Sequence, residues 1–285
     1  MPTDRRRYLV FTSAGEQSCL RDWLHPTRTF DLWVTYFGVG DHPYLQYADY
    51  GNRRTGAKFP NLHYVYRTWP ELMQQYDAVL VIDDDIRITG TQIDTLFALR
   101  EQHDFWIMQP ALDYRGKISH KVTGWQPGFW LRYTNFVELN VPLFRREVLE
   151  QFLAEYDPCI VGYGIDWWYA WLLDRSGAIA ERRMAVIDAV RCLNPHDNVK
   201  KAGLREIDQL QSLEIRKQSW ARIRAERGID IDESGARTLG GIMLPWYRAL
   251  LNRLFWRWNK QQGKRLRRND MTPQTAPPTP PMAPN

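Results

Sequence analysis

The sequence predicts an α/β fold in which a mixed, mostly parallel sheet is flanked by helices and followed by a C-terminal helical extension. Short β-favouring runs alternate with segments of helical periodicity between Tyr8 and Ile187. Residues 78–82 are apolar at every position, as in a central strand that is covered on both faces. We expect mostly parallel neighbours because the helical segments can serve as crossover connections between successive strands.

The predicted strands are short runs of β-branched, aromatic and other apolar residues. They lie at residues 8–12, 32–37, 63–66, 78–82, 105–108 and 184–187. Several of the segments between them carry apolar residues at spacings of three and four, which predicts helices. These helices lie at residues 18–24, 71–76, 91–102, 149–156 and 166–173. A chain of 285 residues can bury one sizeable core, so we expect residues 1–200 to form a single domain.

Three segments follow this domain. Residues 201–244 predict a helical extension, whose apolar side chains between Leu204 and Ile223 are spaced among many charges, as on a surface helix. We expect residues 245–268 to form a basic amphipathic helix. Residues 269–285 are rich in proline and too poor in apolar groups to fold, so we expect a disordered tail.

The positive charge belongs to the C-terminus. Residues 245–268 carry eight Lys or Arg and no acid, so that residues 245–285 have a net charge of +7 although the whole chain has +5. The apolar residues of this helix recur at spacings of three and four, from Trp246 to Trp258. Such a helix either lies in a membrane interface or docks its apolar stripe on the protein's own core, and we expect an anionic membrane surface as its partner. Nucleic acid is not expected, because residues 1–244 are mildly acidic and no recognition motif is present.

The expected compartment is the cytoplasm, with peripheral attachment to the inner membrane face as the alternative to a freely soluble protein. Cys19, Cys159 and Cys192 stand at wide, irregular spacing, which provides neither a disulfide framework nor a zinc site. The first residues lack the apolar core of a signal peptide. No window approaches the roughly 20 apolar residues that a membrane span needs.

Three adjacent carboxylates, Asp83, Asp84 and Asp85, follow the apolar run 78–82. Their mutual repulsion is costly unless a cation or hydrogen-bond donors offset it, and a divalent metal ion is the simplest offset. Ligands of open α/β sheets bind beside the carboxyl ends of strands, where this triplet is expected to lie. The alternative is that the three residues only cap the following turn.

A series of short motifs continues from this triplet. In order and spacing, residues 76–196 resemble a plant and bacterial family known as domain of unknown function seven hundred and seven, which is grouped with the GT-A glycosyltransferases. The matching pieces are Asp83-Asp84-Asp85, Gln109-Pro110-Ala111-Leu112, Ser119-His120, Phe136-Val137-Glu138 with Pro142 and Phe144, Gly162-Tyr163-Gly164-Ile165-Asp166, and His196.

The resemblance implies a GT-A-like, Rossmann-related catalytic domain that uses a UDP- or GDP-linked sugar donor and a saccharide or glycolipid acceptor. It makes Asp83 and Asp85 the outer residues of an Asp-x-Asp motif that contacts the donor and binds Mn²⁺ or Mg²⁺, with Asp84 beside the donor. His196 is implied as a further metal ligand, although a surface loop histidine is an equal alternative. A hard cation suits this chemistry because negative charge grows on the leaving diphosphate as the sugar bond breaks.

Asp166 is the expected general base for the acceptor hydroxyl. It stands in the predicted first turn of an aromatic helix, after glycines that let the backbone approach a ligand closely. The alternative role is that of a helix N-cap. Glu138 is the second candidate for this base or for hydrogen bonding to the acceptor.

Several other residues are expected to contact ligands. His120 either touches the donor phosphate or the acceptor, or only braces its loop. Lys58 precedes the acidic strand and is expected to neutralise phosphate. Trp125 and Trp130 lie in a loop that contains Gly and Pro, and are the favoured tryptophans for stacking on a sugar.

Two other functions stay open. The first is a metal-dependent phosphohydrolase of the haloacid-dehalogenase type, in which Asp83 is a nucleophile. Against it, the motif is expected nearer the start of that fold, and Arg87 stands where a small Thr or Val is usual. The second is a non-catalytic carbohydrate-binding protein that keeps a transferase-like fold.

Overall fold

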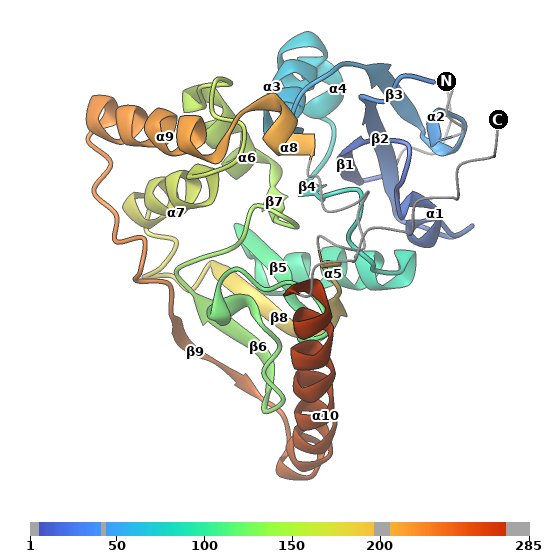
Figure 1. Cartoon of the computed structure of the whole chain (residues 1–285), viewed down its shortest axis with the longest axis vertical. Coiled ribbons are helices and arrows are strands. Elements are labelled where there is room, and N and C mark those ends of the chain that lie inside the picture. The colour runs from blue at the N-terminus through green and yellow to red at the C-terminus, as the bar shows by residue number, and fades with distance from the viewer. Residues whose placement is uncertain (1–5, 41–43, 197–205, 272–285) are drawn as a thin grey trace, which may run out of the picture.

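The computed structural model describes residues 6–40, 44–196 and 206–271 (Figure 1). Its described strands form one mixed sheet in the order β3-β2-β1-β4-β7-β5-β8-β6-β9. The predicted α/β class, with helices flanking a mixed sheet, is confirmed. The strands are β1 Tyr8–Ala14, β2 Phe30–Tyr36, β3 Tyr50–Arg53, β4 Ala78–Val81, β5 Ile107–Leu112, β6 Phe129–Thr134, β7 Leu143–Arg145, β8 Met184–Cys192 and β9 Thr238–Met243.

The helices lie on both faces of this sheet (Figure 1). They are α1 Leu20–Trp23, α2 Tyr44–Tyr47, α3 Lys58–Thr68, α4 Pro70–Met73, α5 Gly90–His103, α6 Arg146–Glu155, α7 Ile165–Arg175, α8 Glu206–Leu210, α9 Leu213–Arg227 and α10 Trp246–Met271, with a 3₁₀ turn η1 Lys121–Thr123. Residues 201–205 of the predicted extension and 272–285 of the predicted tail lie outside the described residues. Within the described ranges, no helix combines the length and the apolar character that crossing a bilayer requires.

The strand order of the sheet reverses at β1, because β2 and β3 follow on one side of β1 and β4 lies on the other. Strand β1 pairs in parallel with β2 on one side and with β4 on the other, and β3 continues the parallel half beyond β2. Antiparallel pairs of β7 with β4 and β5, and of β6 with β8 and β9, build most of the other half. In open α/β sheets such a switch point opens a crevice beside the carboxyl ends of the strands. The ends of β1 and β4 therefore mark the place to look for a ligand.

The central strands are apolar because the sheet has a hydrophobic core on each of its two faces. Along β1, Leu9 and Phe11 point into the core covered by α3, α4, α6 and α7, whereas Tyr8 and Val10 point into the core covered by α1 and α5. Successive side chains of a strand alternate between faces, so a central strand must be apolar at every position. This is the pattern that predicted the strand at residues 78–82.

Helix α5 shows how local sequence sets the ends of an element. Thr89 and Gln92 form a capping box, in which each side chain binds the other residue's backbone N–H. The helix ends at Asp104, which adopts the left-handed conformation with φ 49°. The predicted range 91–102 agrees with the observed one to within the usual variation of helix ends.

The strand predicted at residues 63–66 is wrong, because these residues lie inside helix α3. Tyr64, Val65 and Tyr66 favour strands locally, but the helix places Phe59, Leu62 and Val65 together in the core. Burial of this helical face outweighs the β propensity of three residues. Strands β3, β6, β7 and β9 were not predicted.

Candidate functional site

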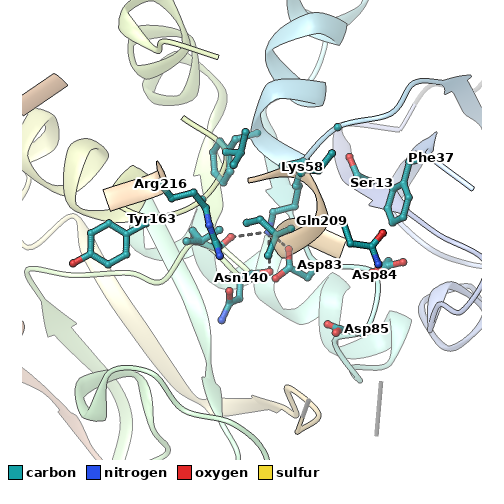
Figure 2. Close-up of a pocket in the computed structure, with 18 of the residues that line it drawn as sticks. Ser13, Phe37, Lys58, Asp83, Asp84, Asp85, Asn140, Tyr163, Gln209 and Arg216 are labelled. Atoms are coloured by element: carbon teal, nitrogen blue, oxygen red, sulfur yellow. Dashed lines mark hydrogen bonds and ion pairs between the residues drawn. The ribbon is translucent and has the colours of Figure 1, made fainter. Parts of the chain in front are cut away.

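A cavity of about 950 Å³ lies at the carboxyl ends of β1 and β4, as the switch point predicts (Figure 2). Its walls come from distant parts of the chain. Ser13 and Gly15 follow β1, the acidic triplet follows β4, Asp166 lies in α7, and helices α8 and α9 close another side. The volume falls in the range of small-molecule and cofactor sites.

The acidic triplet borders this cavity, and its loop is tied to the segment after β1 (Figure 2). The Gly15 N–H donates to Asp84 Oδ2 at 2.9 Å, and the Cys19 N–H donates to the Asp84 carbonyl at 2.7 Å. The side chain of Asp83 is 35% exposed and contacts the ammonium group of Lys58. The triplet therefore shapes the cavity wall as well as carrying charge.

Lys58 directs its ammonium group at oxygen atoms of the protein. Its Nζ lies 2.7 Å from Asp83 Oδ1, 2.7 Å from the Leu139 carbonyl and 3.1 Å from the Asn140 carbonyl. An ammonium has three N–H donors, so these contacts can use all of them. Burial lowers the pKa of Lys58, and the charge of Asp83 opposes this shift. Lys58 lines the cavity and is a counter-ion for Asp83, while its predicted contact with phosphate stays a prediction.

The residues predicted to bind metal are not all brought together. Among the described residues, no group of three or more His, Cys, Asp or Glu side chains is arranged to hold a metal ion. Asp83 and Asp85 line the cavity, but His196 is buried and is not among its lining residues, although Asn194 is. Carboxylates are hard oxygen ligands, and Mg²⁺ is commonly held by one or two of them together with substrate phosphates. The chemistry of Asp83 and Asp85 fits such an ion, with further oxygen ligands supplied by a bound phosphate group.

Asp166 is a buried carboxylate that lines the cavity. It stands in the first turn of α7, but Gly164 is the N-cap, so the alternative role predicted for Asp166 is not the one it has. Its Oδ1 accepts the Trp167 N–H at 3.1 Å. Burial, with a smaller contribution from the nearby charge of Glu138, raises the pKa of Asp166 to about 7. A carboxylate with this pKa can exchange a proton near neutral pH.

Gly164 makes room for a neighbouring helix. It adopts φ 94°, and the ring of Trp220 in α9 occupies the space that a Cβ atom would need. Gly162 is approached in the same way by Ile207 of α8. These glycines therefore allow close packing of α8 and α9. Both also line the cavity, so close approach of a ligand to their backbone stays a prediction.

Glu138 faces the protein interior and is not among the residues lining the cavity. Its Oε1 accepts the Thr123 hydroxyl at 2.7 Å and the His120 N–H at 2.9 Å, and its Oε2 accepts the Asn140 side chain at 3.0 Å. Burial raises the pKa of Glu138. The side chain of Gln109 accepts the Glu138 N–H at 2.6 Å. Glu138 therefore positions the loop before η1 instead of presenting a base to the cavity.

His120 lines the cavity and is packed between two aromatic rings, with ring centroids 4.4 Å from Phe136 and 5.5 Å from Trp167. Burial lowers its pKa, so the imidazole is neutral at physiological pH. Neither tryptophan predicted to stack on sugars lines the cavity. Trp125 is buried against the guanidinium of Arg191, and Trp130 packs on the ring of His103.

Helices α8 and α9 form a wall of the cavity that the sequence did not reveal. Arg216 is buried and lines the cavity (Figure 2). It forms an ion pair with Asp208. Trp220 and Ile223 continue this buried face and join the core beside α7. The three residues recur at spacings of four and three, which is the signal that could have shown a docked face on the predicted surface helix.

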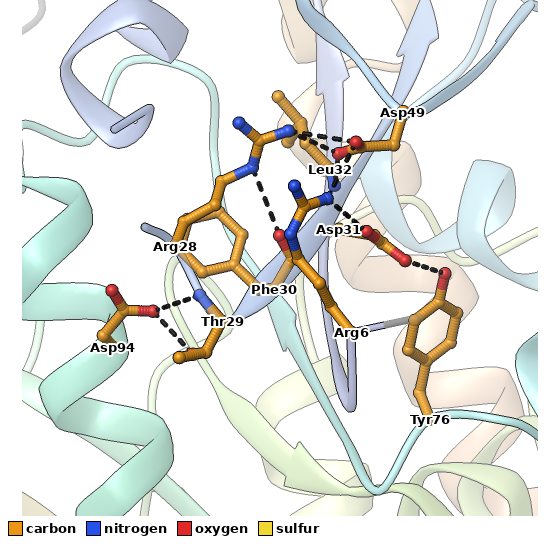
Figure 3. Close-up of polar contacts among 9 residues, drawn as sticks. All are labelled: Arg6, Arg28, Thr29, Phe30, Asp31, Leu32, Asp49, Tyr76 and Asp94. Atoms are coloured by element: carbon orange, nitrogen blue, oxygen red, sulfur yellow. Dashed lines mark hydrogen bonds and ion pairs between the residues drawn. The ribbon is translucent and has the colours of Figure 1, made fainter. Parts of the chain in front are cut away.

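A second group of aspartates lies at the opposite, amino ends of β1 to β4 (Figure 3). We call it the amino-end cluster: Arg6, Arg28, Asp31, Asp49 and Tyr76. Arg6 Nη1 lies 2.7 Å from Asp31 Oδ1 and 2.9 Å from Asp49 Oδ1, and Arg28 Nη2 lies 2.8 Å from Asp49 Oδ2. The Tyr76 hydroxyl donates to Asp31 Oδ2 at 2.9 Å. These contacts join the segments that lead into four neighbouring strands.

Comparison with known proteins identifies no family. No protein-family model and no curated protein matches the chain. Among solved structures, it is similar to GalNAc-T7 with UDP, GalNAc and Mn²⁺, at a TM-score of 0.48 and 9% identity over 68% of this chain and 44% of that one. It is similar to S. aureus TarS at a TM-score of 0.49 and 11% identity, over 80% of this chain and 41% of that one. It is also similar to A197 from STIV at a TM-score of 0.39 and 15% identity, over 65% of this chain and 84% of that one.

The chain thus spans less than half the length of the GalNAc-T7 and TarS chains. With TM-scores from 0.39 to 0.49 and identities from 9% to 15%, these similarities carry no conclusion about activity. The family resemblance of residues 76–196 stays a prediction.

Proposed function

We propose that this chain is a glycosyltransferase, which moves a sugar from a nucleotide-diphospho-sugar to a hydroxyl group of a saccharide or lipid-linked acceptor. One observation carries the proposal: a single cavity at the switch point of the sheet holds both the acidic triplet and the buried carboxylate of Asp166. The first can serve the diphosphate of a donor. The second can serve the hydroxyl of an acceptor.

The donor would lie beside the ends of β1 and β4, where open α/β sheets bind nucleotides. Asp83 and Asp85 would hold Mn²⁺ or Mg²⁺ there, completed by phosphate oxygens of the donor. When bound, such an ion neutralises the charge that grows on the leaving diphosphate. Phe37, Gly38 and Val39, which follow β2, line the same region and would contact the nucleotide.

The acceptor would lie near Asp166. In the proposed reaction the acceptor oxygen forms a bond to the sugar C1 while the bond from C1 to the diphosphate oxygen breaks. The hydroxyl proton passes to the carboxylate of Asp166, and the nucleoside diphosphate leaves with the bonding electrons. A pKa of about 7 leaves a substantial fraction of this carboxyl group ionised at neutral pH and still makes it an effective base.

A thermal-shift measurement with UDP and GDP, each with and without Mn²⁺, tests the proposal. A ligand that binds the native state raises its melting temperature by mass action. We expect one of the nucleotides to stabilise the protein only when the metal is present, and Asp85→Ala to abolish this shift. Asp174→Ala is the matched control, because Asp174 is exposed on α7 and is not a cavity-lining residue.

Either of two results would contradict the assignment. An Asp85→Ala protein that shifts as much as the parent would exclude the metal role. A parent that responds to neither nucleotide would exclude the donor. The phosphohydrolase alternative predicts a phospho-aspartate at Asp83 during hydrolysis of a phosphomonoester, and the non-catalytic alternative predicts nucleotide-sugar binding without any donor hydrolysis in Mn²⁺.

A further inference from the structure

The C-terminal helix exposes its apolar side and docks through its other side. Its buried or half-buried positions recur at spacings of three and four, with Gln262 beside the last of them. They are Ala249, Asn252, Trp256, Asn259, Gln262 and Gly263. They form one face, which lies against the body of the protein. This arrangement shows that the alternative in which the helix docks its apolar stripe on its own core is wrong.

The docked face is held by specific packing. Trp256 packs beside Ala111 and Val186 of the sheet. Its ring meets the ring of Tyr114 edge-on, with the two ring centroids 5.9 Å apart. Gly263 lies directly against the Tyr114 backbone, where a Cβ atom would collide. The Asn252 side chain donates to the Pro127 carbonyl at 3.3 Å. Because these contacts fix the rotation of the helix, the opposite face must point away from the protein.

That opposite face is a continuous apolar surface. We call it the α10 stripe, which consists of Trp246, Tyr247, Leu250, Leu251, Leu254 and Trp258. Phe255 lies at its edge, where its ring meets the ring of Trp125 and the guanidinium group of Arg191. Trp246 is 79% exposed, Leu251 66% and Leu254 63%. Met243, at the end of β9 just before the helix, is also 65% exposed. Contiguous apolar surfaces of this kind on soluble domains mark contacts with membranes or proteins.

The charges around the stripe favour a membrane. The exposed side chains of Arg248, Arg253, Arg257, Lys260 and Lys264 lie on the same helix, and residues 245–268 contain no acid. With 3.6 residues per turn, Arg253, Arg257, Lys260 and Lys264 fall along one border between the stripe and the docked face, and Arg248 falls along the other. Tryptophan and tyrosine in an apolar face with Lys and Arg at its edges are typical of a helix that lies in a lipid interface.

We propose that α10 attaches this protein to an anionic lipid bilayer, with the α10 stripe inserted between the acyl chains and the bordering Arg and Lys side chains at the phosphate level. Attachment to the membrane would also hold the loop that follows β5. Helix α10 packs on Tyr114 of this loop, and Lys117 of the same loop lines the cavity. Docking does not depend on the chemistry proposed for the cavity. It would bring a lipid-linked acceptor close to the site.

Vesicle flotation of the full chain tests the docking. We expect binding to vesicles of phosphatidylcholine with about 30% phosphatidylglycerol, and at least tenfold weaker binding to phosphatidylcholine alone, because anionic headgroups attract the basic residues. Raising the salt to about 0.5 M weakens the anionic contribution. Leu251→Glu places a charge in the stripe and reduces binding at least tenfold. Because Leu251 is exposed, the variant keeps the parent's melting temperature and its nucleotide shift.

Ile215→Glu is the matched control. Ile215 is 49% exposed on α9, outside α10, so the same substitution there leaves vesicle binding unchanged. Equal vesicle binding by Leu251→Glu and the parent would overturn the proposal. So would a parent that ignores anionic vesicles and instead forms a dimer that Leu251→Glu dissociates, since the stripe would then join two copies of the chain.

Discussion

Aspartates gather at both ends of the strands β1 to β4, and the two groups differ in what surrounds them. In the amino-end cluster, Asp31 and Asp49 form ion pairs with the guanidinium groups of Arg6 and Arg28 (Figure 3). At the carboxyl ends, the acidic triplet borders a cavity, and the ammonium of Lys58 contacts Asp83 while also contacting backbone carbonyls (Figure 2). The amino-end carboxylates are matched by arginines within the fold, whereas the triplet adds negative charge to a space large enough for a ligand.

Position in the sheet therefore separates carboxylates that stabilise the fold from carboxylates that border a ligand site. Asp31 is buried and holds Arg6 and Tyr76 together, so its charge is used by the fold. Adjacent carboxylates beside a cavity repel one another, and a bound cation relieves that repulsion. We therefore expect substitutions at the carboxyl ends to change ligand binding or turnover, and substitutions at the amino ends to change stability alone.

The largest expected effect comes from Asp166→Asn. If Asp166 is the general base, turnover falls by about 10² to 10⁴ fold while the nucleotide-induced thermal shift stays. The parent's kcat/KM should rise with pH through about 7 and then level off, because the base acts only when it is ionised. The variant's residual activity should lack this step. Steady-state rates between pH 5 and 9 provide the measurement.

The same variant gives a second readout that a purely structural carboxylate would not give. The pKa of Asp166 in the folded protein is raised to about 7, above its unfolded value near 3.9, so ionising it costs stability as pH rises across that interval. Asp166→Asn removes this cost and should melt at a higher temperature than the parent at pH 8. A variant that loses stability at pH 8 would show that Asp166 supports the fold instead.

A smaller effect is expected for Lys58→Met. The substitution leaves Asp83 without the ammonium group that contacts it, and leaves the half-buried carbonyls of Leu139 and Asn140 without this donor. Breaking a buried ion pair costs roughly 3 to 5 kcal/mol, and because Asp83 is 35% exposed we expect about 2 kcal/mol in urea unfolding. The double variant Lys58→Met with Asp83→Asn should recover part of this loss. Unchanged stability with a weaker nucleotide shift would instead restore the predicted phosphate contact of Lys58.

The features predicted correctly from the sequence depend on neighbouring residues. The apolar run of β4 and the triplet after it fix a strand and its carboxyl end, so the acidic wall of the cavity could be predicted. Asp166 was found because its neighbours mark the first turn of a helix. In both cases a few adjacent residues determine the environment.

The features that were missed depend on contacts between distant segments. Lys58 meets Asp83 only because the start of α3 lies beside the loop after β4, and Arg216 reaches the cavity only because α9 packs on α7. Glu138 points inward because the loop before η1 supplies its donors. The α10 stripe shows the same limit, since an amphipathic pattern defines two faces but does not state which one docks.

A still smaller effect than that of Lys58→Met is expected in the amino-end cluster, for Asp49→Asn. Burial favours a higher pKa for Asp49, but the Leu32 N–H and the Arg28 guanidinium outweigh it and lower the pKa below the usual value. The stability that this carboxylate contributes is therefore present above about pH 4 and is lost as the pH falls through its folded pKa. Asp49→Asn should cost about 1 kcal/mol at pH 7 and make stability less sensitive to acid below pH 4, measured by urea unfolding at several pH values.

The control for Asp49→Asn is Arg7→Ala, which removes exposed ion pairs to Asp77 and Glu101 near the same strand ends. Exposed pairs contribute little, so we expect a change below about 0.5 kcal/mol. Neither substitution should alter the nucleotide-induced thermal shift in Mn²⁺, because neither residue lines the cavity. A reduced shift in Asp49→Asn would mean that the amino ends of the strands are coupled to the site at their carboxyl ends. The division between structural and functional aspartates would then fail, because one rigid sheet would transmit a loss at either end to the other.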